Sequence, residues 1–160
     1  MREALHGDVN PRRFSDSLPS PTVRVATVRD IPFILQVAQE AYPDRDVVMG
    51  IPYMCWCLNS PDRLVLVGQN CFGLARFAWE YGLEARARSE MLASRKGNRA
   101  PWEVLQIVRQ MLIWAKQRGA KGDFVLDSDT EVDFEPFARR LKGRKTTLVQ
   151  YKIALETCHG

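Results

Sequence analysis

The fold is decided by residues 90–127, which read EMLASRKGNRAPWEVLQIVRQMLIWAKQRGAKGDFVLD. The middle of this stretch predicts a long amphipathic helix, because apolar residues recur there every three or four positions. They are Val104, Leu105, Val108, Met111, Leu112 and Ala115. Pro101 suits the first turn of the helix, where its missing N–H leaves no bond unmade. Gly119 follows the basic residues Lys116 and Arg118 and predicts a left-handed cap where the helix ends.

The two flanks of this helix suggest what it does. Asp123–Asp127 (DFVLD) reads as a buried strand that follows it. A helix that begins at a glycine-containing loop presents free N–H groups and the positive end of its dipole, which together suit a phosphate group. An ordinary strand–loop–helix crossover without a ligand explains the same features, so both interpretations stay open from these residues alone.

The totals indicate one domain with a normal core. The chain has 160 residues, 46% of them hydrophobic, and a net charge of +4. No apolar run reaches the roughly 20 residues of a membrane span, and the polar beginning has no signal-peptide core. The mild positive charge suits an anionic cofactor and does not by itself indicate nucleic acid. We expect a cytoplasmic protein with reduced thiols and no metal site, since Cys55 and Cys57 have no second close pair of ligands.

The first 60 residues predict an arm, a strand and two helical pieces. Residues 1–21 are polar, contain three prolines and read as an extended N-terminal arm. Residues 22–28 predict a strand whose Val23 and Val25 share an apolar face. Asp30 is a suitable N-cap for a helix that ends at Tyr42-Pro43. The apolar side of that helix contains Ile34, Leu35, Val37, Ala38 and Ala41. A second short helical piece is expected within residues 44–60.

The rest of the chain predicts a hairpin and a mixed sheet. Residues 63–67 and 71–79 are strand-like runs joined by Gly68-Gln69-Asn70, which suits a hairpin. Residues 83–93 fit a helix as well as a strand, and we predict a strand because it completes an antiparallel sheet. Further on, residues 130–142 predict a helix that ends at Gly143, and residues 146–155 predict a last strand. The expected fold is α/β (α+β), a mixed but mostly antiparallel twisted sheet flanked by helices.

This order of elements resembles the GNAT superfamily of acyl-CoA-dependent N-acetyltransferases. The likeness covers about residues 22–155, and the domain it implies is 22–160. Residues 23–32 (VRVATVRDIP) look like the family's first strand and helix. Residues 114–121 (WAKQRGAK) look like the end of its central helix, and residues 137–143 (FARRLKG) like the helix before its last strands.

The resemblance implies acetyl-CoA as cofactor, held by the loop before the central helix. The family's loop pattern is Q/R-x-x-G-x-G/A, and its backbone amides hold the pyrophosphate of coenzyme A. This chain has Ser94 to Ala100 (SRKGNRA) there, with Arg99 in place of the second glycine, where a side chain limits the approach of a phosphate. The cofactor-binding residues that the resemblance implies are Met91, Ala93, Arg95, Lys96, Gly97, Asn98, Arg99 and Ala100.

The resemblance also implies one catalytic residue, and it shows that a second catalytic residue of the family is missing in this chain. Glu90 falls near the family's glutamate on the fourth strand, which activates the acceptor amine through water; an exposed carboxylate without a catalytic role is the alternative. The family's general acid is a tyrosine three residues before Leu141, where this chain has Ala138.

Two functions therefore stay open, besides a small nucleic-acid-binding module that rests on charge alone. The first is an acyl-CoA N-acyltransferase that acetylates an amine directly, without a covalent enzyme intermediate. The second is a GNAT-fold protein that has lost catalysis and serves as a binding or structural component, similar to some bacteriophage virion proteins. In that case residues 1–21 would bind a protein partner or a second copy in an assembly, with Phe14 and Leu18 as anchors and Arg12 and Arg13 meeting acidic groups.

Overall fold

A computed structural model describes residues 22–44, 46, 50–80, 84–97, 100–126 and 135–146. The chain divides into two compact units, residues 1–126 and 127–160, and each is described by itself. The predicted arm at residues 1–21 lies outside the described residues, as do residues 147–155 of the predicted last strand.

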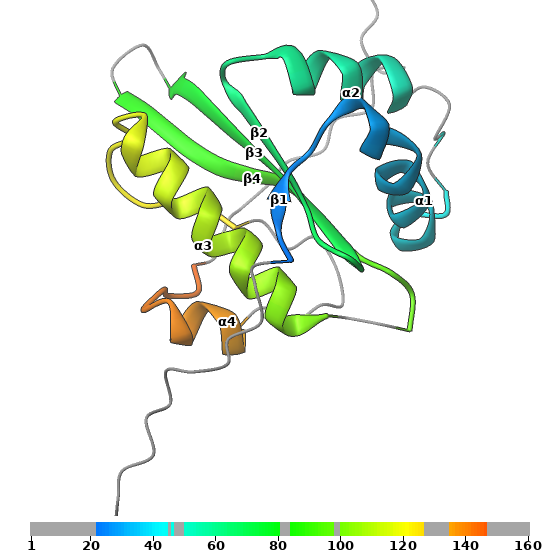
Figure 1. Cartoon of the computed structure of the whole chain (residues 1–160). Helices are drawn as coiled ribbons and strands as arrows, with labels where there is room; N and C mark the ends of the chain where they lie inside the picture. Colours follow the sequence, from blue (N-terminus) through cyan, green and yellow to red (C-terminus); the bar gives the residue numbers. More distant parts are fainter. Residues whose placement is uncertain are drawn as a thin grey trace, which may run out of the picture. The chain divides into compact units, whose positions relative to one another are not determined.

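The first unit is built on a sheet of four strands in the order β1-β2-β3-β4, all antiparallel to their neighbours (Figure 1). The strands span Arg24–Val25, Arg63–Val67, Cys71–Glu80 and Glu84–Ser94. The predicted hairpin is confirmed: the Gly68 N–H donates to the Cys71 carbonyl at 2.8 Å, which closes the turn between β2 and β3. The ambiguous segment at residues 83–93 is also a strand, β4, as predicted.

Helices cover both faces of this sheet. α1 (Ile31–Ala41) and α2 (Gly50–Asn59) pack on one face, and α3 (Pro101–Gln117) packs on the other (Figure 1). The core between the sheet and the first two helices contains Ile31, Ile34, Val37, Met54, Cys57, Val65, Val67, Phe72 and Leu74. None of the helices among the described residues is long and apolar enough to cross a membrane.

α3 lies close against the sheet because β3 has a glycine beneath it. A Cβ atom added at Gly73 would lie 2.5 Å from both Ile107 Cγ2 and Met111 Cε. The predicted apolar stripe is buried apart from Leu112, which is half-buried, and it also includes Ile107, which the spacing argument omitted. Gly119 has the predicted left-handed conformation, with φ of 81°.

The expectations for Val25 and Ala41 are wrong, and the one for Asp30 holds only in part. Val25 is 61% exposed, and the buried neighbours are Val23 and Ala26, because β1 has only two residues and does not continue the alternation. Asp30 is the N-cap residue of α1, as predicted, but its side chain makes no capping hydrogen bond to that helix. Its carboxylate instead accepts from the Thr27 N–H at 2.8 Å and caps the short 3-10 helix η1 (Val28–Asp30) that leads into α1. Ala41 is exposed and does not share the apolar side of α1.

After α3 the chain returns along β4 in the parallel direction, as expected. The described contacts are a bridge between Arg88 and Val125 and a hydrogen bond of 2.7 Å from the Lys121 N–H to the Ala85 carbonyl. Val125 is 40% exposed, so the expectation of a buried strand is wrong at this residue. The second unit contains α4 (Glu135–Arg140) within the predicted helix. Lys142, with φ of 57°, has the left-handed conformation after it, one residue before the predicted Gly143.

Candidate functional site

β4 contains a bulge at Glu90. Leu74 of β3 pairs with Met91, and the next residue, Ala75, pairs with Ser89, so Glu90 has no partner of its own. Such an extra residue bends a strand and shifts the pattern of its hydrogen bonds. β4 therefore has two differently oriented halves, which meet at the residue that the sequence singled out as catalytic.

Among the described residues, the bulge also marks the last contact of β4 with the chain that follows α3. Before it, the Ser89 N–H donates to the Val125 carbonyl at 2.9 Å. After it, the Arg95 N–H donates to Asn70 of the hairpin at 2.8 Å, which fixes the alternation of this half. By that alternation the N–H groups of Leu92 and Ser94 point away from β3, toward the opposite edge of β4. No hydrogen bond between residues 121–126 and Leu92 or Ser94 is recorded on this edge. This edge can accept a ligand that lies along the strand.

The Glu90 side chain points to the face that α1 and α2 cover. Its Oε2 accepts from the Tyr53 hydroxyl at 3.1 Å and lies 3.2 Å from Arg63 Nε, while its Oε1 lies 3.3 Å from Arg76 Nε. The carboxylate is thus half-buried and contacts donors from α2, β2 and β3. The alternative that Glu90 is an exposed, unengaged carboxylate does not fit this geometry.

Aromatic rings and a thiol complete this cluster. The Arg63 guanidinium lies over the Trp56 ring, 4.7 Å from its centroid, and the Tyr53 ring lies 5.8 Å from the same centroid. Burial raises the pKa of the Tyr53 hydroxyl, and the neighbouring Cys57 and Glu90 raise it further. Burial also raises the pKa of the Cys57 thiol, against hydrogen bonds from Tyr53 and Arg63 that lower it. Both groups are therefore protonated near neutral pH.

The predicted cofactor loop follows β4 directly. Gly97 has a φ of 82° and Ala100 a φ of 37°, so both residues turn through left-handed conformations before α3 begins at Pro101. Asn98 and Arg99 lie outside the described residues. The first N–H groups of α3 have no partner within the helix and carry the positive end of its dipole, as an anion site requires.

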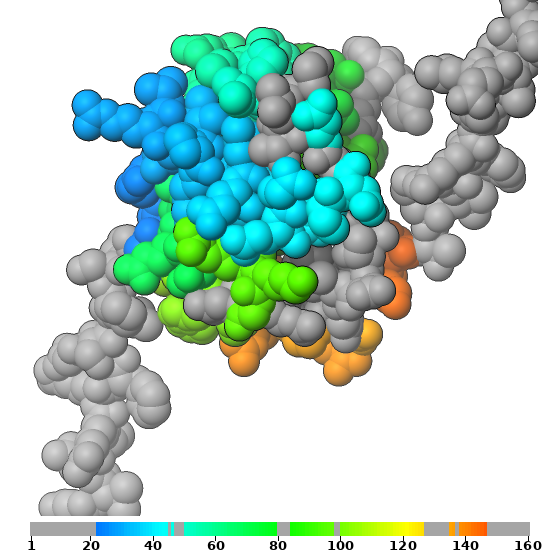
Figure 2. Space-filling view, turned by 90° about the vertical axis from the view of Figure 1, so that its right-hand side faces the viewer, coloured from blue at the N-terminus to red at the C-terminus, as the bar shows by residue number. Residues whose placement is uncertain are grey.

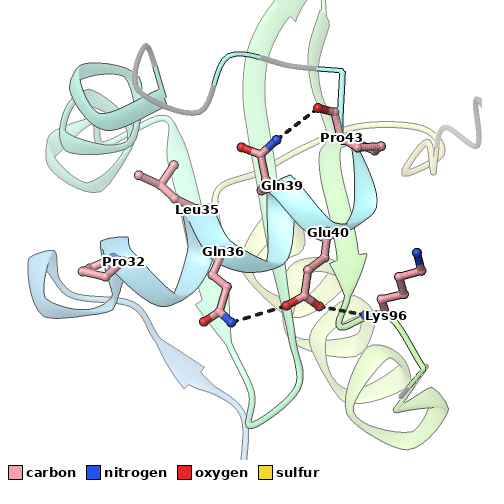
Figure 3. A pocket seen from close by; sticks show the side chains of 7 residues that line it. All are labelled: Pro32, Leu35, Gln36, Gln39, Glu40, Pro43 and Lys96. Atoms are coloured by element: carbon pink, nitrogen blue, oxygen red, sulfur yellow. Dashed lines mark hydrogen bonds between the residues drawn. The ribbon is translucent and has the colours of Figure 1, made fainter.

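A carboxylate from α1 already binds this loop. Glu40 Oε2 accepts from the Lys96 N–H at 2.9 Å, and Glu40 Oε1 accepts from Gln36 Nε2 at 3.4 Å (Figure 3). Arg95 in turn donates to Gln36 Oε1 at 3.4 Å, and its guanidinium lies 5.4 Å from the centroid of the Phe33 ring. One of the backbone donors that the resemblance assigns to pyrophosphate is thus held by the protein itself.

The same contact borders an open hollow of about 680 Å³ on the outer side of α1. Figure 2 shows the blue and cyan atoms of α1 beside the green atoms that follow β4. The side chains around the hollow belong to Pro32, Leu35, Gln36, Gln39, Glu40, Pro43 and Lys96. Its lining is apolar and amide-rich, with one carboxylate and one ammonium group.

Comparisons with solved structures identify the fold. The chain is similar to aminoglycoside 6'-N-acetyltransferases from Acinetobacter haemolyticus and Acinetobacter baumannii, at 17% and 18% identity, each with a TM-score of 0.68. The matches cover 82% of this chain in both cases, and 97% and 96% of the other chains. The chain has the GNAT fold. No protein-family model and no curated protein matches the sequence.

A further GNAT-fold neighbour is the aminoglycoside N-acetyltransferase AAC(6')-Iy, whose structure contains CoA. It is 11% identical, with a TM-score of 0.68, and the match covers 83% of this chain and 93% of that one. In this chain Glu40 accepts from the Lys96 N–H of the loop, and Ala138 lies in α4. Within the described residues no group of three His, Cys, Asp or Glu side chains could hold a metal.

The structure adds residues that the sequence reasoning missed. Met91 and Ala93 pack into the core beneath α1, and their amides point to β3 by the strand alternation, so Leu92 and Ser94 offer the outward donors. Glu40 was not anticipated, since it lies more than fifty residues before the loop. Tyr53, Arg63 and Arg76 were also missed. These last three also come from different elements, and only the pairing of β2, β3 and β4 brings them to Glu90.

Proposed function

We propose that this protein is an acyl-CoA-dependent N-acyltransferase that transfers an acetyl group to an amine. The observation that supports this most directly is the edge of β4 beyond Ser89, which no described residue pairs with and which leads to the start of α3. The extended pantetheine arm of coenzyme A can bind along such an edge through the N–H groups of Leu92 and Ser94. The phosphates of coenzyme A then reach a helix N-terminus, where backbone donors and the dipole favour negative charge.

The charges and backbone donors of the described loop residues suit the phosphate groups of acetyl-CoA. Arg95 and Lys96 supply positive charge at the loop, and Gly97 supplies a turn without a side chain. Glu40 opposes the fit, because its carboxylate would repel a phosphate at the Lys96 amide. Binding therefore requires this carboxylate to turn away from the loop.

The residues of this chain orient the reactants and accept a proton. Acetyl-CoA supplies an activated acetyl thioester. The Leu92 N–H polarises the carbonyl of that acetyl group, which favours attack by an amine held on the Glu90 side of the sheet. A carbon–nitrogen bond forms, the carbon–sulfur bond breaks, and the amine proton passes through a water molecule to the Glu90 carboxylate. Arg63, Arg76 and Tyr53 hold that carboxylate in position.

The test is a calorimetric titration with acetyl-CoA, followed by a thiol-release assay with a panel of amines. We expect binding, and slow thiol release that increases with the correct amine. Glu90→Gln should lower transfer by about 10²-fold or more without changing acetyl-CoA affinity. Glu84→Gln is the matched control, because Glu84 lies on the same strand but pairs with Arg86. Full activity of Glu90→Gln would remove the base role.

Cofactor binding itself is tested at the loop. Reversing the charge of Lys96 and Arg99 together should weaken acetyl-CoA binding by about 1–3 kcal/mol, the size of two charge-assisted contacts. An unchanged affinity in this double variant would place the cofactor elsewhere.

A second function is favoured by one specific observation, the Glu40 contact on the Lys96 amide. In a protein that no longer binds the cofactor, a carboxylate of the chain itself can occupy the Lys96 amide without loss of function. The chain would then be a binding or structural component, located in the cytoplasm or in a virion, with residues 1–21 binding its partner. Deleting residues 1–20 and comparing the mass in solution and the captured partners with the intact chain tests the arm. Equal mass and equal captures would end this proposal.

A further inference from the structure

Three arginines lie in one row across the sheet, on the face that contains Glu90. Arg63 of β2 pairs directly with Arg76 of β3, and Arg76 pairs directly with Arg88 of β4. Directly paired residues of neighbouring antiparallel strands project from the same face, with Cβ atoms about 5 Å apart. Like charges in this arrangement destabilise a sheet, so the row needs a compensating negative charge.

Glu90 supplies only part of that compensation. Its two oxygens contact Arg63 Nε and Arg76 Nε, so two guanidinium groups share one carboxylate and keep a net charge of about +1. Two other carboxylates near the row are engaged elsewhere: Asp62 pairs with Arg118 and Glu84 pairs with Arg86. Among the described residues, Arg63 and Arg76 therefore place more positive charge beside Glu90 than this carboxylate balances.

Arg76 has the geometry to bind a further anion. Its Nε lies 3.3 Å from Glu90 Oε1, its side chain is 34% exposed, and no hydrogen bond from its Nη groups to a described residue is recorded. The Nη edge of a guanidinium fits the two oxygens of a carboxylate or phosphate in parallel hydrogen bonds.

An exposed aromatic surface adjoins the row. Trp56 is 52% exposed and Tyr53 is 39% exposed, although both rings contact the cluster around Arg63 and Glu90. Aromatic rings that are rigidly held but open to solvent favour contact with an apolar or flat part of a ligand. The side chains around Glu90 thus offer an anion site, an aromatic surface and a proton acceptor together.

We propose that the acceptor of the acetyl group is a small amine that also carries an anionic group, a carboxylate or a phosphate. The Nη edge of Arg76 binds the anionic group, Trp56 and Tyr53 contact the body of the molecule, and the amine lies beside Glu90. A polycationic amine is disfavoured by the same charges. This inference rests on the proposed function only in identifying the ligand as the acetyl acceptor, because the anion site exists without the cofactor.

The experiment measures binding by calorimetry without any cofactor. It uses two matched pairs of probes: L-phenylalanine with phenethylamine, and phosphoethanolamine with ethanolamine. Each pair differs only in the anionic group, so the pair with the larger affinity ratio shows whether the site prefers a carboxylate or a phosphate. We expect the preferred anionic probe to bind at least about tenfold more tightly than its neutral-tailed partner, as one charged hydrogen-bonded contact provides. Spermidine should not compete.

Arg76→Gln should abolish this preference, while Arg86→Gln should preserve it. Arg86 is the matched control, because it lies on β4 and pairs with Glu84 instead of Glu90. Arg76→Gln removes both a like-charge contact with Arg63 and the ion pair with Glu90, so thermal unfolding is measured to verify that the variant is folded at the temperature of the titration. Equal binding within both pairs, no binding by either anionic probe, or the same loss in both variants would overturn the proposal. Anion-dependent binding without acetyl transfer would uphold it and contradict only the proposed function.

Discussion

Replacement of Glu40 by glutamine should make the protein bind acetyl-CoA more tightly. In the structure Glu40 Oε2 accepts from the Lys96 N–H at 2.9 Å, and this contact must open before a phosphate can use the same donor. A hydrogen bond to a charged acceptor contributes about 1.5–3 kcal/mol, and one to a neutral acceptor about 0.5–1.5 kcal/mol. Glutamine has the same shape, so the change lowers the cost of opening by about 1 kcal/mol and also removes a repulsive charge.

The two effects together predict a gain of about 1–2 kcal/mol, or about 5- to 30-fold in affinity. Calorimetric titration with acetyl-CoA at fixed ionic strength measures it. Asp44→Asn is the matched control, because it removes the same charge from an exposed position four residues beyond Glu40. Unchanged or weaker binding by Glu40→Gln, or an equal gain in the control, would refute the idea that Glu40 occupies a phosphate site.

The remaining predictions concern stability and reactivity. Gly73→Ala should destabilise the fold by about 1–3 kcal/mol, measured by urea unfolding, because the new Cβ meets two α3 side chains; an unchanged midpoint would mean that α3 moves freely. The hydrogen bond from Arg24 lowers the pKa of the Asp30 carboxyl group. The ionised Asp30 therefore stabilises the folded state above about pH 4, and this stabilisation is lost as pH falls below that value. Asp30→Asn should lack this part of the acid dependence. Burial raises the pKa of Cys71, so iodoacetamide should label it at pH 8 far more slowly than the half-buried Cys55; equal rates would contradict the burial.

Much of the fold could be predicted because its signals are local. The hairpin was predicted by the Gly68-Gln69-Asn70 turn between two strand-like runs, and α3 by its apolar stripe and its cap at Gly119. β1 was less predictable, because with two residues it is too short for alternation to hold, and Val25 is exposed as a result. Asp30 occupies the predicted N-cap position of α1, but its side chain bonds to the preceding turn, and the sequence alone does not show which of two consecutive turns a capping side chain closes.

The candidate site was less accessible to sequence reasoning. Glu90 could be named, but only by resemblance, and its contacts with Arg63 and Arg76 depend on the register of three strands. Residues that lie side by side across a sheet are far apart in the sequence, and their spacing follows no regular period that a sequence pattern could reveal. The role of Glu40 could not be predicted from the sequence for a similar reason. Its contact with Lys96 depends on the packing of α1 over the end of β4.

The bulge at Glu90 has a consequence for how this chain tolerates insertions and deletions. Before it, the odd-numbered residues of β4, such as Ser89, face α3; after it, the odd-numbered residues, such as Met91 and Ala93, face α1. Two alternating patterns of opposite phase are thus joined by a single residue. Loss of Glu90 itself would bring Ser89 and Met91 next to each other opposite Ala75 and Leu74, so the strand would pair without a bulge and every side chain would keep its layer. A one-residue deletion elsewhere in the first half of β4 could also be absorbed by the bulge, but the side chains between the deletion and the bulge would then turn to the opposite layer. The strand therefore tolerates the loss of one residue best at Glu90.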